Sequence, residues 1–145
     1  MSKVQSTTCN ATSDLTINIP DTQGRNIVLY FYPKDATSGC TIEGQDFRDK
    51  HQAFIDANAV IYGVSKDDMA SHEKFKANQS FPFELIADES GELCEAFGVW
   101  QVKGEKMGIV RSTFIISPKG EILKSWDKVK VDGHIDEVLA AVQAL

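Results

Sequence analysis

The stretch 27–43 constrains the fold more than any other part of the sequence. Its first six residues, Ile-Val-Leu-Tyr-Phe-Tyr, are all aliphatic or aromatic, which predicts a buried central strand. Pro33 ends that strand, because proline cannot donate to a sheet ladder. A polar turn through Ser38 and Gly39 follows, and a helical pattern opens at Cys40. The sequence therefore predicts a strand, a turn and a helix that carries a thiol in its first turn.

Cys40 stands where a cysteine becomes a nucleophile. Backbone N–H groups in the first turn of a helix have no helical partner, and the positive end of the helix dipole lies there, so a thiolate is stabilised. The alternative is a small apolar core residue that happens to begin a helix. The neighbouring residues favour the reactive thiol.

Those neighbours carry a family resemblance. The spacing Pro-x-x-x-Thr-x-x-Cys, with Pro33, Thr37 and Cys40, resembles the active-site loop of the peroxiredoxins. The segments Phe-Tyr-Pro-Lys-Asp at 31–35 and Asp-Phe-Arg-Asp at 46–49 resemble its bacterioferritin comigratory protein (PrxQ) branch. The similarity runs from about Leu15 to the C-terminus. The family usually has proline where this chain has Ser38. This replacement leaves the thiol and the threonine in place but makes the loop that holds them less rigid.

The resemblance implies an AhpC/TSA-type thiol peroxidase, of the thioredoxin-dependent type, that reduces hydrogen peroxide and organic hydroperoxides at Cys40 in antioxidant defence. Such chemistry needs an oriented O–O bond and stabilisation of the charge that moves to the departing oxygen. Thr37 can place its hydroxyl beside the sulfur, and Pro33 shields the sulfur from water. The backbone N–H groups of Gly39 and Cys40 are candidate oxygen-binding dipoles.

Arg111 is the expected cation of the site. It stands at the start of an apolar strand, where a charge is unfavourable without a purpose. The resemblance supports it, because the family has an arginine two residues before the Thr-Phe pair of this strand; the alternative is a surface arginine at a strand end. Glu43 either ties Arg111 into place or favours the helix N-terminus by its charge. Arg48 is expected to face water.

Oxidised Cys40 must be reduced by another thiol. Relatives often hold that thiol five residues further on or in the next helix, and these places are Gln45 and, approximately, Lys76. Cys94 is a candidate on a later helix, the alternative being a buried structural thiol, and Cys9 is a candidate near the N-terminus. We therefore expect a one-cysteine cycle completed by an external thiol: thioredoxin, glutaredoxin or glutathione.

The order of predicted elements indicates an α/β fold. Helical crossovers give parallel strands and a hairpin gives antiparallel ones, so we expect a mixed central sheet with helices on both faces. This is the thioredoxin-like arrangement that the resemblance also implies. The expected elements are strands at 15–19, 27–32, 59–64, 83–87, 110–117 and 121–126, helices at 40–57, 67–78, 89–97 and 131–145, and a loop at 103–108. Phe47, Phe54 and Ile55 are expected on one buried stripe.

We expect one domain over 1–145, of which 1–13 is a loosely ordered tail. The net charge of -6 argues against nucleic acid or an anionic membrane as a partner. No apolar stretch approaches the ~20 residues of a membrane span, and no signal-peptide pattern is present. Three widely spaced cysteines fit a reducing compartment. We expect a cytoplasmic protein, monomeric or weakly dimeric.

Other kinds of site are poorly supported. The three histidines, His51, His72 and His134, do not stand at zinc-ligand spacing from any cysteine, and there is no glycine-rich phosphate loop, so no metal or cofactor is expected. There is no C-x-x-C. The alternative functions are a non-enzymatic thioredoxin-fold binding or chaperone module and a thiol–disulfide oxidoreductase. Steady consumption of peroxide with a thiol donor separates them from a peroxidase.

Overall fold

The apolar run at 27–32 lies at the centre of the sheet. In the computed structural model, which describes residues 3–145, it forms β3 (Asn26–Phe31), five of whose six residues are buried. The other strands are β1 (Thr7–Ala11), β2 (Leu15–Ile19), β4 (Ala59–Ser65), β5 (Glu84–Ala87), β6 (Trp100–Lys103), β7 (Lys106–Ile109), β8 (Ser112–Ile116) and β9 (Ile122–Trp126). The helices are α1 (Ser38–Asp49), α2 (His51–Asp56), α3 (Met69–Gln79), α4 (Glu92–Ala96) and α5 (His134–Gln143).

Strand pairing brings two distant segments to one edge of the sheet. The seven strands of the main sheet follow the order β2-β1-β5-β4-β3-β8-β9. β3 pairs in parallel with β4 and antiparallel with β8, where Phe31 faces Ser112. An antiparallel partner starts where its neighbour ends. The residue before β8 therefore lies at the edge from which the turn after β3 departs.

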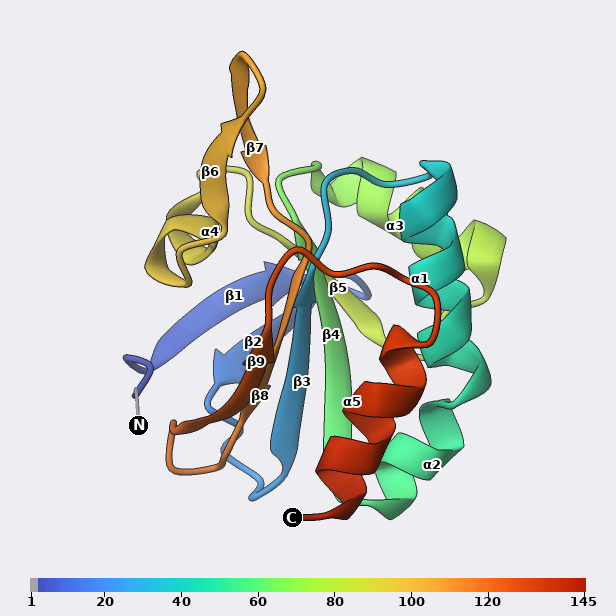
Figure 1. Ribbon diagram of the computed structural model, residues 1–145, viewed down its shortest axis with the longest axis vertical. Helices are drawn as coiled ribbons and strands as arrows, with labels where there is room; N and C mark the ends of the chain where they lie inside the picture. Colours follow the sequence, from blue (N-terminus) through green and yellow to red (C-terminus); the bar gives the residue numbers. More distant parts are fainter. Residues whose placement is uncertain (1–2) are drawn as a thin grey trace.

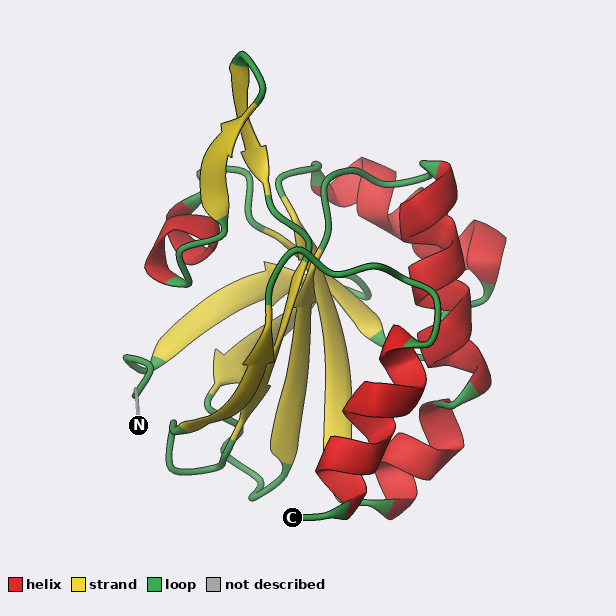
Figure 2. Ribbon diagram, viewed as in Figure 1, coloured by secondary structure: helices red, strands yellow, loops and turns green. Residues whose placement is uncertain are grey.

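Helices cover both faces of this sheet, as predicted (Figures 1 and 2). On one face α1, α2, α3 and α5 enclose a core that includes Tyr30, Cys40, Phe47 and Phe75, which we call the α1-side core. On the other face α4 lies over a second core that includes Phe31 and Cys94, the α4-side core, and Trp100 at the start of β6 packs against it. Alternate residues of β3 supply the two cores, because successive side chains of a strand point to opposite faces. Among residues 3–145, no helix combines the length and apolar character needed to cross a bilayer.

The expectation of a loosely ordered tail over 1–13 is wrong for residues 7–11. Within 1–13, Thr7–Ala11 forms β1, which pairs antiparallel with β2 and, through Ala11, with Ile86 of β5. Residues 1–2 lie outside the described part of the chain. β1 shows little apolar alternation because most of its side chains are exposed and its backbone hydrogen bonds hold it in the sheet.

Two further elements differ from the prediction. The helix expected to run from Cys40 to about Ala57 is divided into α1 and α2 at Lys50. Phe47 and Phe54 are fully buried as predicted, but Ile55 is 41% exposed, because it lies about 100° around the helix axis from Phe54. The expected loop 103–108 is part of the β6–β7 hairpin, which turns at 104–105. Its side chains are mostly exposed, so it leaves no pattern of buried positions.

Gly44 allows α1 to pack closely against Phe81. A Cβ at this position would lie 2.3 Å from Cζ of Phe81, so the ring would have to move. We expect Gly44→Ala to lower the free energy of unfolding by roughly 1–2 kcal/mol. So close a contact places the overpacking cost at about 2–3 kcal/mol, and the better helix propensity of alanine offsets about 1 kcal/mol of it. Urea unfolding measures the change. Gln52→Ala on the exposed side of α2 is the control, and equal stability of Gly44→Ala and the parent would contradict the predicted packing.

Candidate active site

Cys40 occupies the first turn of α1 and is 1% exposed. The helix begins at Ser38, slightly earlier than predicted, and Thr37 is its N-cap residue with extended backbone angles of −79° and 155°. No side chain caps this turn. The N–H groups at the start of α1 therefore lack a side-chain acceptor, as an anion-binding helix start requires. Serine in the first helical position has not prevented the helix from starting there.

Arg111 reaches this turn from the residue before β8, the strand that pairs with β3. Its Nη2 lies 3.3 Å from Sγ of Cys40, and its Nη1 donates to Oε1 of Glu43 at 2.5 Å. The Arg111 side chain is 16% exposed and that of Glu43 is fully buried. Gly39 leaves room for the guanidinium, because a Cβ there would lie 3.2 Å from Nη2. The structure thus brings Arg111 to Cys40 and Glu43, which precede it by about 70 residues.

For both Glu43 and Arg111, burial and the charge of the other residue of the pair shift the pKa in opposite directions. Burial lowers the pKa of Arg111, but the negative charges of Glu43 and Cys40 outweigh it and the net pKa is raised, so the guanidinium stays cationic. Burial raises the pKa of Glu43 from 4.5 to about 7, although the pairing with Arg111 opposes this. Oε2 of Glu43 is buried without a hydrogen-bond partner in the described structure. Glu43 is therefore a carboxyl group whose charge is sensitive to pH near neutrality.

The loop between β3 and α1 carries the remaining predicted residues. Pro33 is half-buried at its start, next to the end of β3. The exposed Thr37 donates its hydroxyl hydrogen to the carbonyl of Lys34 at 2.8 Å, which leaves the lone pairs of Oγ1 free to accept. Arg48, expected to face water, instead donates to the carbonyl of Gln79 at 2.9 Å. It ties α1 to α3.

A buried polar cluster beside this loop was not predicted. Asp35 accepts hydrogen bonds from Tyr32, Ser71 and His72. Ligand atoms of Asp35, Asp67 and His72 lie within 4.8 Å of one another, as in a metal site. However, Asp67 already accepts from the amide of Asp35 and from Ser65, so hydrogen bonding accounts for the arrangement. Sequence offers no signal for the cluster, because α3 and the loop meet only through the fold.

The two other cysteines belong to the opposite face of the sheet. Cys94 is fully buried in the α4-side core and Cys9 packs against that core, whereas Cys40 belongs to the α1-side core. Burial, and then the charge of Asp88, raises the pKa of Cys9 to about 11 and that of Cys94 further. The sheet therefore separates both thiols from Cys40, and neither environment favours a thiolate.

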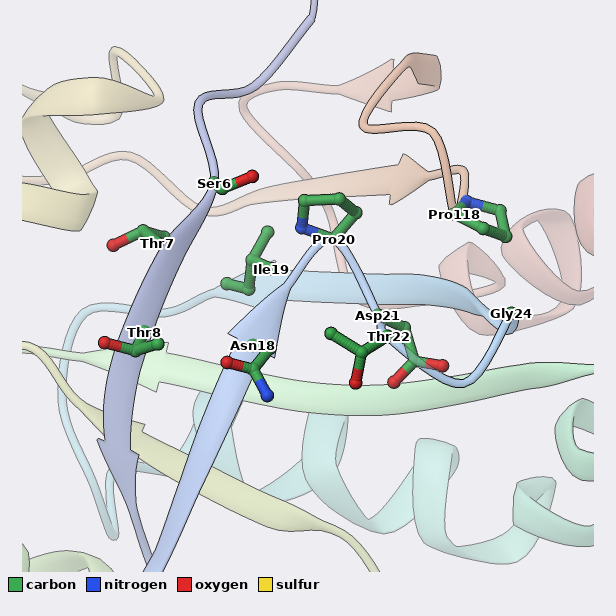
Figure 3. A pocket seen from close by; sticks show the side chains of 10 residues that line it. All are labelled: Ser6, Thr7, Thr8, Asn18, Ile19, Pro20, Asp21, Thr22, Gly24 and Pro118. Carbon is green, nitrogen blue, oxygen red and sulfur yellow. The ribbon is translucent and has the colours of Figure 1, made fainter.

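A surface hollow of about 750 Å³ opens elsewhere on the molecule and is not part of this site (Figure 3). Its one ionisable lining residue, Asp21, is already paired with Arg25 at 3.0 Å. Its lining residues do not include Cys40 or Arg111; they are Ser6, Thr7, Thr8, Asn18, Ile19, Pro20, Asp21, Thr22, Gly24 and Pro118.

Comparison with known proteins agrees with this geometry. The model of the AhpC/TSA family matches residues 2–125. Peroxiredoxin Bcp of Bacillus subtilis is 48% identical over 132 residues, covering 88% of this chain and 84% of that protein. The structure of peroxiredoxin Q from Xanthomonas campestris matches with a TM-score of 0.92 and 43% identity, covering 95% of this chain and 90% of that one. A structure of the bacterioferritin comigratory protein of Xanthomonas campestris, studied for alkyl peroxide reduction, matches with a TM-score of 0.91 and 42% identity over the same shares.

The fold is therefore thioredoxin-like, and the protein is a thiol-dependent peroxidase. The chain belongs to the AhpC/TSA family, within its Bcp/PrxQ branch of peroxiredoxins. The resemblance seen in the sequence is confirmed at the level of family and fold.

The raised pKa of Glu43 predicts a dependence of stability on pH. Between about pH 4.5 and about pH 7 the folded chain holds a proton on Glu43 that the unfolded chain has lost, so stability rises as the pH falls through this window. Going from about pH 7.5 to about pH 5.5 should stabilise the parent by roughly 1–2 kcal/mol more than Glu43→Gln. Urea unfolding at both pH values measures this.

The comparison with Glu43→Gln cancels the contribution that other titrating groups make to the pH dependence of stability. His134, whose pKa burial lowers to about 4, contributes equally to the parent and to Glu43→Gln. The same pH response in both proteins would show that Glu43 does not titrate in this window.

Proposed function

We propose that Cys40 is the peroxidatic nucleophile of this peroxidase and that Arg111 is its electrostatic partner. The observation that carries the proposal is the Arg111 guanidinium 3.3 Å from a buried sulfur at the start of a helix. A cation at this distance stabilises the thiolate and, in the transition state, the oxygen from which the sulfur displaces its leaving group. A small apolar core residue would gain nothing from such a neighbour.

In the proposed reaction the Cys40 thiolate attacks one oxygen of a hydroperoxide. A sulfur–oxygen bond forms as the O–O bond breaks, and the electron pair of that bond leaves with hydroxide or alkoxide, which takes up a proton as water or alcohol. Sulfur is oxidised to sulfenic acid and the peroxide is reduced. Arg111 and the free N–H groups of Gly39 and Cys40 are the proposed donors to the peroxide oxygens.

We assign supporting roles to the neighbouring residues. The free lone pairs of Thr37 Oγ1 can accept a hydrogen bond from the hydroperoxide O–H, which orients the O–O bond. Pro33 limits access of water at the other side of the loop. Glu43 fixes the position of Arg111 through the bond between Nη1 and Oε1. A neutral Glu43 would leave more of the guanidinium charge for the sulfur.

We propose that an external thiol completes the cycle. It attacks the sulfenic acid of Cys40, water leaves, and a second thiol exchange releases reduced Cys40 and a disulfide. Cys94 and Cys9 are poor candidates because both lie on the far face of the sheet and are held as thiols. A thioredoxin, a glutaredoxin or glutathione has the required chemistry. Since Cys40 is buried, a protein thiol would reach it only when the first turn of α1 opens.

The compartment and partners follow from the same proposal. Three cysteines without a disulfide among the described residues suit the reducing cytoplasm. With a net charge of -6, we propose neither nucleic acid nor an anionic membrane as a partner. One domain over 1–145 and a monomeric or weakly dimeric state stay predictions.

Removing the Cys40 sulfur tests the nucleophile. We expect Cys40→Ser to lose peroxide consumption by at least about a hundredfold, because serine is not ionised at neutral pH. Cys9→Ser and Cys94→Ser should each retain most of the parent rate with dithiothreitol as reductant. Stopped-flow measurement of hydrogen peroxide consumption gives all three values. A Cys40→Ser protein as active as the parent would rule out Cys40.

Removing the Arg111 charge tests the partner. Arg111→Met keeps the length of the side chain but loses the guanidinium, and should lower the second-order rate constant with peroxide by about 10²-fold, the effect of one transition-state donor. Lys124→Met is the control, because it removes a cation from the exposed side of β9. If both variants reacted like the parent, Arg111 would have no part in the chemistry.

A further inference from the structure

The carboxylate of Asp35 anchors the loop that leads to Cys40. It is 6% exposed, and its Oδ1 accepts from the hydroxyl of Tyr32 at 2.5 Å. Its Oδ2 accepts from Ser71 at 2.8 Å and lies 2.6 Å from Nδ1 of His72. The backbone amide of Asp35 donates to Asp67 at 2.8 Å. Four contacts therefore fix one residue of a loop, three of them from outside it.

His72 connects this anchor to the sheet. Its side chain is fully buried on α3, and its second ring nitrogen, Nε2, lies 2.9 Å from the carbonyl oxygen of Ile86 in β5. Both neighbours of the ring are acceptors. Nε2 therefore donates to Ile86, while another proton lies between Nδ1 and the Asp35 carboxylate. That bond is charge-assisted or shares an acid proton, and either form is stronger than a neutral hydrogen bond.

Ala36, the next residue of the loop, has a backbone conformation that needs support from its surroundings. Ala36 has a φ of 62°, in the left-handed region that residues with a Cβ rarely adopt. Such a conformation persists only where the surrounding structure fixes it, and it is common at functional sites. Thr37, the N-cap residue of α1, follows immediately. The turn at Ala36 thus sets the direction in which Thr37 and the first turn of α1 leave the loop.

We propose that His72 is a positioning residue of the peroxidase site. By holding Asp35 against β5 it keeps Ala36 in its left-handed turn, and so keeps Thr37 and the N–H groups of α1 in register with Cys40 and Arg111. This inference rests on the proposed function, because it assigns His72 a role in the same reaction. His72 itself acts only through Asp35 and the loop.

Two substitutions of His72 distinguish the roles of its two hydrogen bonds, one to Asp35 and one to Ile86. The amide nitrogen of asparagine can stand near the place of Nδ1 and donate to Asp35, whereas that of glutamine reaches the place of Nε2 and donates to Ile86. Each keeps one hydrogen bond, so a purely structural role predicts similar losses. We expect His72→Gln to lower the rate constant with hydrogen peroxide about tenfold and His72→Asn to stay within about threefold of the parent.

Glycine at position 36 provides a rescue. Glycine adopts positive φ without the penalty of a Cβ, so the turn no longer depends on the anchor. We expect Ala36→Gly to leave the parent rate within about twofold and to restore the rate of His72→Gln by about threefold or more. A loss of helix packing around α3 would not be rescued by a change in this loop.

The experiment measures peroxide consumption and amide hydrogen exchange of residues 35–41 for these variants, with urea unfolding to confirm that each is folded. Lys76→Met is the matched control: it removes the ion pair between α3 and Glu84 of β5 without changing a contact of Asp35, and should change neither peroxide consumption nor the exchange of these amides. The proposal predicts faster exchange in His72→Gln, reversed in part by Ala36→Gly. Equal effects of asparagine and glutamine, or no rescue, overturn it. Exchange does not depend on peroxide chemistry, so an inactive parent would refute the proposed function and leave the anchoring role separately measurable.

Discussion

The contact between the Arg111 guanidinium and the Cys40 sulfur depends on the sheet. Arg111 precedes β8 and Cys40 follows β3, and the antiparallel pairing of these strands brings both to one edge. Glu43, one helical turn after Cys40, holds the other side of the guanidinium. The site therefore has one cation that contacts both the Cys40 sulfur and a buried carboxyl group. In the proposed mechanism, the share of this charge that acts on the sulfur sets the reactivity of Cys40.

Much of this arrangement could be predicted from local patterns. The apolar run before Pro33 was long and continuous enough to mark a buried strand, and the polar turn after it marked the helix start that carries Cys40. Arg111 could be identified from the sequence because a charged side chain at the start of an apolar strand is unfavourable unless it has a partner or a function. The closing hairpin and the last helix followed from their turn residues and periodicity, and both are present as β8–β9 and α5.

The remaining features depend on contacts that no local pattern encodes. β1 and the β6–β7 hairpin are held by backbone pairing, and their mostly exposed side chains carry no apolar alternation. Ile55 is exposed although its spacing matched a buried stripe, because it lies about 100° around the axis of α2 from the buried Phe54. His72 lies within the helix predicted at 67–78, where no pattern marks it as buried, but it is fully buried between Asp35 and Ile86. Such a pairing is visible only once α3 is placed against the loop.

We propose that Cys40 is the one cysteine of this chain that peroxide oxidises, because Cys94 and Cys9 lie on the far face of the sheet. The most direct test is non-reducing peptide mapping after one equivalent of hydrogen peroxide, with dimedone present to trap sulfenic acid. The structure predicts a dimedone adduct on Cys40 and unmodified Cys94 and Cys9. A stoichiometric disulfide between Cys40 and Cys94 would contradict the account, because it would require both helix starts to unfold and the two thiols to meet around the sheet.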